Sequence, residues 1–369
     1  MSGVRSEGAS EGRAAPAGRD PSRSTSMITA AVVVPAAPAL LPGMVQAAAR
    51  WLTPDDPPVV LTVERGGELL ALTCLQRRAP DLFVPLPHWR AYRHPHAFQS
   101  GILHRTGEAH AVAEAIAGLM RRGSWRERAI RWHCVAADSD MWKALRGAAD
   151  MHWMQTAASL RPVLRRHPDD VPAAARVGTG VAKDLRRRLR RLQERGDVGL
   201  RILQGAQADA AAAARHLALE HAGWKGTRGS SMQASAAERG FFLEATARLA
   251  AGGHLVFVET LCGDQVVASS SNLLCGRVLG GFKTGWDPAF AACSPGKLNE
   301  WHLLQALDTH WPALLMFDSQ AQASSYLAEL LPDRQPMVSG ILHAGALHGA
   351  AILAARPLRP LAYRLGHDD

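Results

Sequence analysis

Apolar and polar residues follow the same pattern in two segments that lie far apart along the chain. Residues 59–78 read VVLTVERGGELLALTCLQRR, and residues 255–274 read LVFVETLCGDQVVASSSNLL. In each segment a Gly-containing turn separates two runs rich in apolar and β-branched residues, which is typical of a β-hairpin. Residues 60–64 correspond to residues 256–259 with a slip of about one residue, at a spacing far beyond the roughly 20 to 50 residues of a solenoid repeat. The pattern predicts a duplicated domain.

The C-terminal half alternates between helical and strand periods. The expected elements are a helix over 183–195, a strand over 198–203, helices over 208–221 and 236–251, the hairpin from 255, a strand over 277–286, a helix over 298–310, a strand over 313–317, a helix over 323–331 and a strand over 337–343. Helices that lead into three antiparallel strands, and are followed by alternating helices and strands, make an α/β (α+β) sandwich over a mixed sheet.

Length and local composition predict two domains. A chain of 369 residues exceeds what one hydrophobic core usually serves. Pro, Gly and Ala are dense over residues 161–180 and no apolar period survives there, which is typical of a linker. Residues 1–26 hold almost no large apolar side chain and are expected to form a disordered tail. We therefore predict an N-terminal domain over 27–160, a C-terminal domain over 181–345 and a C-terminal extension over 346–369.

Charge and cysteine usage narrow the setting of the protein. The chain carries 42 Lys and Arg against 33 Asp and Glu, a formal charge of +9, and a basic surface favours anionic partners. Its cysteines lack CxxC spacing and the density of a disulfide framework, so we expect a cytoplasmic protein. The apolar stretch over 27–41 is interrupted by Pro35 and Pro38 and is too short to span a membrane. Only peripheral contact with a membrane stays open.

The most informative segment covers residues 280–307 and reads GGFKTGWDPAFAACSPGKLNEWHLLQAL. A strand is expected to enter a turn, after which Ser294-Pro295-Gly296-Lys297 opens a helix. A helix N-terminus presents N–H groups without intrahelical acceptors and the positive end of the macrodipole, so this turn can hold a diphosphate. Lys297 would add a formal charge beside it. Taken alone, the same residues are also an ordinary Ser cap followed by Pro and Gly.

Other catalytic motifs are missing from the sequence. It contains no GxSxG elbow, P-loop, HExxH or paired Cys/His spacing, so hydrolase, NTPase and zinc-site interpretations lack their minimal parts. His94 and His96 form an HxH pair, but only His88 and His104 are near enough in sequence to supply a third ligand. We therefore expect no metal site.

Several short motifs occur in the order found in one enzyme superfamily. They are LRRRLRRL over 185–192, Trp224-Lys225-Gly226, Phe282-Lys283, Trp286-Asp287, Ser294-Pro295-Gly296-Lys297-Leu298, Phe317-Asp318 and Tyr326. In these motifs the C-terminal half resembles the GNAT acyltransferases, and more narrowly the acetyltransferases associated with bacterial cellulose biosynthesis, the CelD type, which are related to the FemAB aminoacyltransferases. The N-terminal half resembles that group only in outline and has no counterpart of the SPGK turn. The resemblance implies two tandem GNAT-like domains, the N-terminal one degenerate and without its own cofactor.

The resemblance also implies roles for individual residues. The donor would be acetyl-CoA or a longer acyl-CoA, held by Phe282, Lys283, Thr284, Ser294, Gly296, Lys297 and Leu298. Tyr326 would protonate the departing thiolate, and Asp318 and Glu220 are candidate bases. The acceptor would lie against Trp224, Lys225, Trp286 and Asp287.

These side chains also have structural interpretations. Tyr326 could pack in the core with Leu327 and Leu330, while Asp318 or Glu220 could act as a helix cap or salt-bridge partner. Leu327 stands where the family tends to carry Lys, which indicates either a different acceptor or reduced activity.

A strongly basic helix is compatible with a second kind of donor, charged tRNA. Leu185, Leu189 and Leu192 form a stripe that is expected to pack, while Arg186, Arg187, Arg190 and Arg191 face elsewhere. Such a face is commonly just solvated, although anionic carbohydrate, a membrane surface or RNA could meet it. Nothing in the sequence matches a recognised nucleic-acid module, so tRNA enters only in the alternative described next.

The sequence thus predicts an acyl-CoA-dependent acyltransferase that acts on an amine or hydroxyl of a cell-envelope or exopolysaccharide-related acceptor. That acceptor would be a small molecule, a glycan or a peptidoglycan precursor. One alternative is FemAB-like aminoacyl transfer from charged tRNA, which would be strongly salt-dependent. Another is a non-catalytic partner in polysaccharide biosynthesis that keeps the fold.

Overall fold

Two compact units divide the chain in the computed structural model, which describes residues 2–6, 38–124, 128–166 and 171–358. Unit 1 combines residues 1–40, 55–159 and 336–369, and unit 2 combines residues 41–54 and 160–335. Strand β7 (Met151–Arg165) and strand β13 (Asp333–Ala344) each have residues in both units. No helix over the described ranges is long and apolar enough to cross a membrane.

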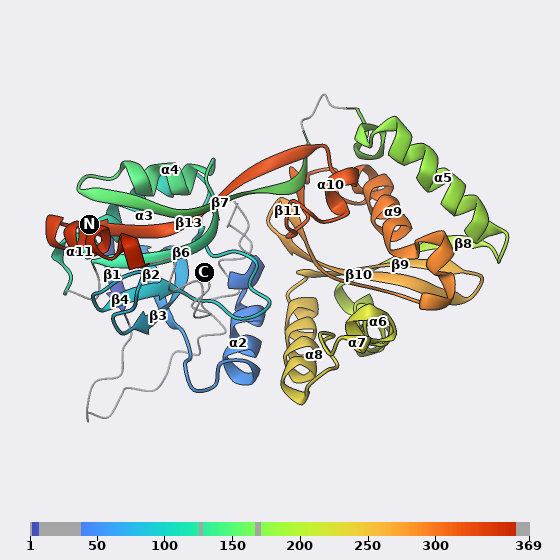
Figure 1. The fold of residues 1–369 in the computed structure, drawn as a ribbon, viewed down its shortest axis with the longest axis horizontal. Helices are drawn as coiled ribbons and strands as arrows, with labels where there is room; N and C mark the ends of the chain where they lie inside the picture. Colours follow the sequence, from blue (N-terminus) through green and yellow to red (C-terminus); the bar gives the residue numbers. More distant parts are fainter. Residues whose placement is uncertain (1, 7–37, 125–127, 167–170, 359–369) are drawn as a thin grey trace. The chain divides into compact units, whose positions relative to one another are not determined.

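Unit 1 is built on a mixed sheet with the strand order β1-β2-β3-β4-β6-β13 (Figure 1). Its strands are β1 (Ser2–Ser6), β2 (Val59–Arg65), β3 (Glu68–Arg78), β4 (His88–Ala91), β6 (Ala129–Ala136) and β13, with β5 (Leu103–His104) paired to β3. The β4–β6 pair is parallel, and the other ladders of this order are antiparallel. Its helices are α3 (Ala109–Arg122), α4 (Asp140–Gly147) and α11 (Ala346–Ala354), with 3₁₀ turns at Pro38–Leu40 and Arg356–Leu358.

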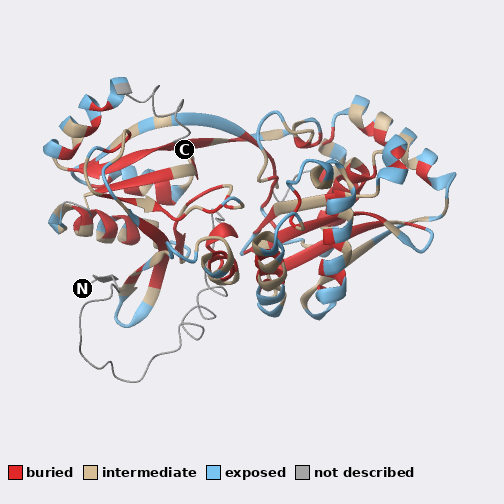
Figure 2. Cartoon of the chain, turned by 60° about the horizontal axis from the view of Figure 1, so that its bottom comes forward, coloured by how far each residue is buried: buried red, intermediate tan, exposed pale blue. Residues whose placement is uncertain are grey.

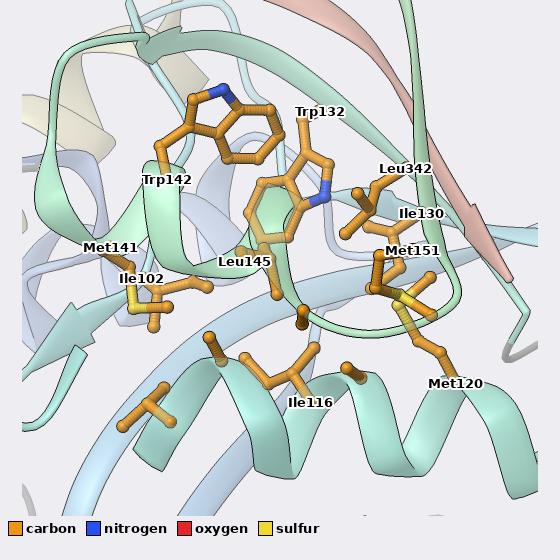
Figure 3. Packing of buried hydrophobic residues seen from close by; sticks show 14 of the residues in the cluster. Ile102, Ile116, Met120, Ile130, Trp132, Met141, Trp142, Leu145, Met151 and Leu342 are labelled. Carbon is orange, nitrogen blue, oxygen red and sulfur yellow. The ribbon is translucent and has the colours of Figure 1, made fainter. Parts of the chain in front are cut away.

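The core of unit 1 is apolar and rich in tryptophan. Ile116 and Met120 of α3 face Trp132 of β6 and Trp142 of α4 (Figure 3), and all four are at most 4% exposed. The Trp142 ring meets the Trp153 ring edge to face, with centroids 4.7 Å apart. Aromatic pairs of this geometry add to the free energy gained from burial alone. This half of the chain is held together mainly by apolar packing.

Unit 2 has its own mixed sheet, in the order β7-β12-β11-β10-β9-β8. Its strands are the end of β7, β8 (Val198–Gln204), β9 (Leu255–Cys262), β10 (Gln265–Cys275), β11 (Val278–Trp286) and β12 (Met316–Asp318). The β11–β12 pair is parallel, and the others are antiparallel. Its helices are α2 (Pro42–Trp51), α5 (Thr179–Gln193), α6 (Ala210–Ala222), α7 (Trp224–Thr227), α8 (Ala236–Ala251), α9 (Pro295–His310) and α10 (Leu327–Leu330), with 3₁₀ turns at Ala173–Arg176, Gly205–Gln207 and Pro288–Cys293.

Helices cover both faces of the sheet in unit 2. In Figure 1, α6, α7 and α8 lie on one side of β9 and β10, and α5, α9 and α10 lie on the other. We call these the α6–α8 face and the α9 face. The central strands are buried along most of their length while the outward sides of the helices are exposed (Figure 2), as two covered faces require.

The two units repeat one arrangement, as the paired hairpin motifs predict. A hairpin, a third antiparallel strand, a helix and a parallel strand occur as β2-β3-β4-α3-β6 in unit 1 and as β9-β10-β11-α9-β12 in unit 2. The strand after each repeat then pairs in the other unit: β7 pairs with β12, and β13 pairs with β6. The mixed α/β class expected from the sequence is confirmed.

Three segments differ from the expected organisation. Ser2–Ser6 forms β1 against β2, because pairing at a sheet edge uses backbone hydrogen bonds and needs no large side chain; the rest of the predicted tail lies outside the described residues. Residues 41–54 belong to unit 2, where α2 packs against α8. The predicted linker begins inside β7, and Arg161 of that strand is a buried partner of Asp318.

Candidate active site

Strand β11 continues past the end of its parallel partner and carries the expected donor residues. The β11–β12 ladder joins residues 278–280 to residues 316–318, where β12 ends. On the other edge, Ser271 pairs with Lys283 and Asn272 pairs with Gly281, so Phe282 is an extra residue in β11. This is a β-bulge, a feature that re-aims side chains and backbone groups. The Phe282 ring stacks on Phe242 of α8, with centroids 6.2 Å apart.

On the α6–α8 face, a cluster of charged side chains surrounds Lys283. Glu220 of α6 is 2% exposed, and its carboxylate accepts hydrogen bonds from the Lys225 amine at 2.9 Å and the Met232 backbone at 2.8 Å. The Lys225 amine also donates to the backbone oxygen of Thr284 at 3.0 Å. Predicted catalytic and acceptor residues thus meet directly at β11.

Burial shifts the proton affinities of this cluster. Removal of the Lys283 amine from water lowers its pKa to about 8, although Glu220 and Glu238 oppose that shift. Burial raises the pKa of Glu238. Burial, with Lys225 and Lys283 nearby, lowers the pKa of His216 to about 3, so this histidine is neutral at pH 7. Lys283 therefore has a substantial neutral fraction close to neutral pH.

Close backbone approach fixes α6 against β11. A Cβ atom added to Gly285 would lie 2.3 Å from the backbone nitrogen of Glu220. A Cβ atom added to Gly226 would lie 1.8 Å from the backbone oxygen of His221. Only glycine fits at these two positions, so α6 sits tightly on β11, and α7, which carries Lys225, sits tightly on the end of α6.

On the α9 face, Thr284 lies between two acidic side chains from different helices, Glu300 of α9 and Tyr326 at the start of α10. Its hydroxyl lies 3.1 Å from Glu300 Oε1, and it also hydrogen-bonds to Tyr326. Burial raises the pKa of Glu300 to about 7, and burial, with Glu300 nearby, raises the pKa of Tyr326. Tyr326 is therefore protonated at neutral pH, and Glu300 is about half protonated there.

The sequence predicts that Tyr326 lies within a helix over 323–331. In the structure it lies at the N-cap of α10, which is shorter. The Lys297 amine lies 5.9 Å from the centre of its ring, and Leu327 and Leu330 behind it are buried. The tyrosine body packs at the edge of the core while its hydroxyl meets Thr284. The packing and chemical interpretations of Tyr326 are thus compatible.

Further polar groups fill the space between β10 and α9. Asn299 donates to Ser270 at 3.0 Å, and Thr260 contacts both Asn299 and His302 at 3.1 Å. Asn272 Oδ1 and Glu300 Oε2 are buried without a hydrogen-bond partner among the residues that the structure describes. Buried polar atoms are normally paired, so these two side-chain atoms stand out among the described residues of unit 2.

The turn before α9 differs from an ordinary Ser cap. Ser294 is left-handed, with φ of 49°, and its side chain makes no cap hydrogen bond to the described first turn of α9. Instead its hydroxyl accepts from Arg188 of α5 at 2.5 Å. Gly296 is buried, and an added Cβ would lie 3.1 Å from Cδ1 of Trp286.

This turn has the chemistry that a diphosphate requires. The first turn of α9 leaves N–H groups without intrahelical acceptors. Arg188 and Lys297 add positive charge beside it; Lys297 is ion-paired with the exposed Glu329 at 2.7 Å. Leu298 is fully buried and packs in the core rather than at the turn's surface. The donor set therefore fits the diphosphate of an acyl-CoA.

Asp318 is held in a structural arrangement. It is 2% exposed, lies 3.2 Å from the Arg161 guanidinium and accepts hydrogen bonds from the backbone and side chain of Gln320. Asp318 is not brought together with Glu220, which contacts β11 through Lys225 on the other face.

The remaining predicted acceptor residues are more dispersed. Trp224 is 53% exposed at the start of α7, with the Arg228 guanidinium 5.1 Å from its ring centre. Trp286 lies beneath Gly296. Asp287 caps the 3₁₀ turn through Ala289 and accepts from Gln265 at 2.7 Å.

Sequence reasoning missed three groups that the fold brings to β11. Arg188 was hidden within a run of arginines, Glu300 lies in a helix that looks amphipathic, and Glu238 occupies the first turn of α8. An acid followed by Leu303 and Leu304 at i+3 and i+4 was the available signal for Glu300. No group of three potential metal ligands occurs over the described residues.

Comparisons with known proteins give a family for the C-terminal half. Residues 180–312 match the family model described as an acetyltransferase (GNAT) domain. No curated protein matches the sequence.

Solved structures extend the likeness to the whole chain. A conserved protein of unknown function from Bacteroides thetaiotaomicron is 10% identical over 88% of this chain and 97% of its own, with a TM-score of 0.56. FemX is 9% identical over 94% of this chain and 98% of its own, with a TM-score of 0.54. At such identity the likeness establishes the fold alone. The chain therefore shares the mixed α/β fold of these structures, and within its C-terminal half residues 180–312 match a GNAT acetyltransferase domain.

Proposed function

We propose that the protein is an acyl-CoA-dependent acyltransferase that transfers an acetyl or longer acyl group to an amine. One observation carries the proposal. A bulged strand, β11, has on its α9 face two acids whose pKa values burial raises, and on its α6–α8 face a Lys–Glu cluster, and it leads to a helix N-terminus flanked by Arg188 and Lys297. Strand β11 and the helices next to it thus provide groups that suit a thioester, a nucleophile and a diphosphate.

The donor would bind along the end of β11. The diphosphate would meet the N–H groups at the start of α9, with Arg188 and Lys297 balancing its charge. The pantetheine arm would follow the part of β11 beyond β12, where backbone groups and the unpartnered Asn272 Oδ1 can bond its amides. Phe282, Lys283 and Thr284 would then lie beside the thioester.

Transfer needs a base, stabilisation of the oxyanion and an acid for the thiolate. Glu220, or the neutral fraction of Lys283, would take the proton of an incoming amine on the α6–α8 face. Backbone N–H groups at the bulge would stabilise the oxyanion. Tyr326 would protonate sulfur, while Asp318 would keep β7 and β12 together through Arg161 rather than act as a base.

The acceptor is best described by charge. Glu220 and Glu238 lie near Lys283 and Lys225, so the cluster offers carboxyl groups that can bind an acceptor ammonium and an amine, Lys283, that can take up its proton. Trp224 and Lys225 would form its outer wall. A cell-envelope or exopolysaccharide-related acceptor is the proposal that follows from resemblance to the CelD type.

A second candidate is aminoacyl transfer from charged tRNA. The FemX-like fold and the exposed residues Arg186, Arg187, Arg190 and Arg191 on α5 favour it. Binding through these arginines would weaken steeply with salt, whereas binding in the turn before α9 would weaken far less.

Calorimetric titration with acetyl-CoA tests the main proposal. We expect micromolar binding, about 8 kcal/mol, which Gly296→Glu abolishes because it adds bulk and negative charge at the diphosphate turn. Gly180→Glu is the matched control, since Gly180 is also the second residue of a helix, α5, and has open space around it. A folded parent that binds no acetyl-CoA would overturn the proposal; loss of binding in both variants would show that the turn is not the site.

A further inference from the structure

A buried carboxyl group on α9 lies directly behind the tyrosine that the proposed function uses as an acid. Glu300 is 3% exposed, and its Oε1 lies 3.1 Å from the hydroxyl oxygen of Thr284. Thr284 in turn hydrogen-bonds to Tyr326. Side chains from α9, β11 and the start of α10 thus form one continuous row of exchangeable protons.

The surroundings of Glu300 suit the neutral acid better than the carboxylate. Its Oε2 is buried without a hydrogen-bond partner among the described residues. A buried carboxylate ordinarily accepts several hydrogen bonds or pairs with a cation, because the loss of its hydration is costly. A single hydroxyl does not replace that hydration, whereas a protonated carboxyl needs only one acceptor for its proton, and the Thr284 oxygen is in reach.

With the titratable groups near it, Glu300 is mostly neutral below about pH 7. Burial raises the pKa of Glu300 to about 7, and the Thr284 hydrogen bond opposes the rise. Burial lowers the pKa of His302, farther along α9, to about 4, so that ring is neutral. Lys297 faces the Tyr326 ring and is ion-paired with Glu329, and Arg188 is paired with Asp184 on α5.

We propose that Glu300 is a positioning residue of the transfer reaction: it holds a proton that passes through the hydroxyl of Thr284 to Tyr326 as Tyr326 protonates the departing thiolate. This inference rests on the proposed acyl-CoA function. It explains why a helix that packs against the sheet buries an acid opposite a strand threonine, which packing alone does not require.

The proton movements balance. The acceptor nitrogen bonds to the thioester carbonyl carbon and gives its proton to the base, and the carbon–sulfur bond breaks with its electron pair on sulfur. Tyr326 gives its proton to sulfur, Thr284 gives its hydroxyl proton to Tyr326, and Glu300 gives its proton to Thr284. Glu300 is left as a carboxylate and regains a proton from solvent after CoA leaves, while the base releases its proton to solvent.

The test compares the parent with Glu300→Gln, which keeps the shape and removes the transferable proton. Acetyl-CoA affinity is measured by calorimetry, and release of CoA from acetyl-CoA is followed with hydroxylamine as a nucleophile that needs no recognition. Because hydroxylamine ionises identically in every assay, the ratio of parent to variant rates removes its own pH dependence. Glu194→Gln, an exposed acid at the end of α5, is the control.

We expect the variant to bind acetyl-CoA within about twofold of the parent and the parent-to-variant rate ratio to be on the order of 10-fold or more near pH 6. Since Glu300 loses its proton with rising pH, the ratio should fall towards about 1 above roughly pH 8.5. A ratio that stays constant with pH means a purely structural role and overturns the inference while leaving the proposed function standing. A parent that binds acetyl-CoA but releases no CoA to hydroxylamine also overturns it.

Thr284 supplies an independent check of the route. Thr284→Ser keeps the hydroxyl, so its rate should follow the same pH profile as that of the parent. Thr284→Val should behave like Glu300→Gln. If Thr284→Val retains the parent profile, the proton does not pass through this residue and the inference fails. Absence of acetyl-CoA binding by the folded parent would overturn the proposed function and, with it, this inference.

Discussion

The starts of helices α3 and α9 occupy the same place in the two repeats but have opposite charge. Helix α9 begins after Ser294, which contacts Arg188, and Lys297 lies in its first turn. Helix α3 begins after Glu108, whose carboxylate is paired with Arg65. A carboxylate at a helix N-terminus interacts favourably with the macrodipole from within the protein. A turn with basic side chains can instead bind an anion from outside at the same position. One fold can therefore provide either a closed end or a ligand site through a few residues.

The same contrast extends along the two helices. The inner side of α3 is apolar, with Ile116 and Met120 against the tryptophans of unit 1. The inner side of α9 carries buried Asn299, Glu300 and His302. Buried polar groups lower stability unless they are fully satisfied, so they are expected where they serve chemistry. The inner side of α3 thus suits packing, whereas the inner side of α9 carries polar groups that can take part in chemistry.

The largest effect is expected from a substitution that disrupts the packing of unit 1. Trp142→Ala should lower the free energy of unfolding by about 3 to 5 kcal/mol, because it removes a side chain that is 4% exposed and contacts two other tryptophans. Acetyl-CoA affinity of the folded protein should not change. Denaturant unfolding and calorimetry measure the two quantities.

Trp142→Phe is the matched control for that change. It keeps an aromatic ring against Trp153 and removes an indole N–H that has no partner among the described residues, so its cost should be clearly smaller. Weakened acetyl-CoA binding by folded Trp142→Ala would contradict the contrast between packing around α3 and chemistry around α9.

A smaller effect sharpens the comparison at the turn itself. Arg188→Ala should weaken acetyl-CoA binding about tenfold, or about 1.4 kcal/mol, because a charged donor beside the diphosphate is lost. The loss should shrink at high salt. Arg191→Ala, an exposed residue on the same helix, is the control and should bind like the parent. Equal weakening in both variants would point to the whole basic face of α5 rather than to the turn.

The sequence predicted the order of elements in unit 2 well, because long periodic segments carry their own signal. The predicted helix over 236–251 coincides with α8, and the strand and turn before α9 are where the motif places them. The strand exchange could not be predicted. Local pattern shows that β7 and β13 are strands but not which sheet each one joins.

The candidate site was only partly predictable for the same reason. Motifs located Lys225, Thr284, Ser294 and Tyr326, which the fold gathers around β11. Glu300 becomes visible only when α9 is laid on the sheet, since an acid in a helix is usually solvent-exposed. Asp318 was expected as a base because it ends a strand, and its pairing with Arg161, which is distant in sequence, could not be foreseen.

The smallest effect is expected from a substitution that tests whether charge alone makes the starts of α3 and α9 differ in ligand binding. Glu108→Gln removes the acid from the start of α3 and should cost at most about 1 kcal/mol of stability, since the Arg65–Glu108 pair is partly exposed. Calorimetry should still find one acetyl-CoA per chain, because the turn before α3 has no counterpart of the Ser294-Pro295-Gly296-Lys297 sequence. A second equivalent of acetyl-CoA, retained when Gly296→Glu is added, would show that unit 1 holds a complete site that Glu108 keeps closed.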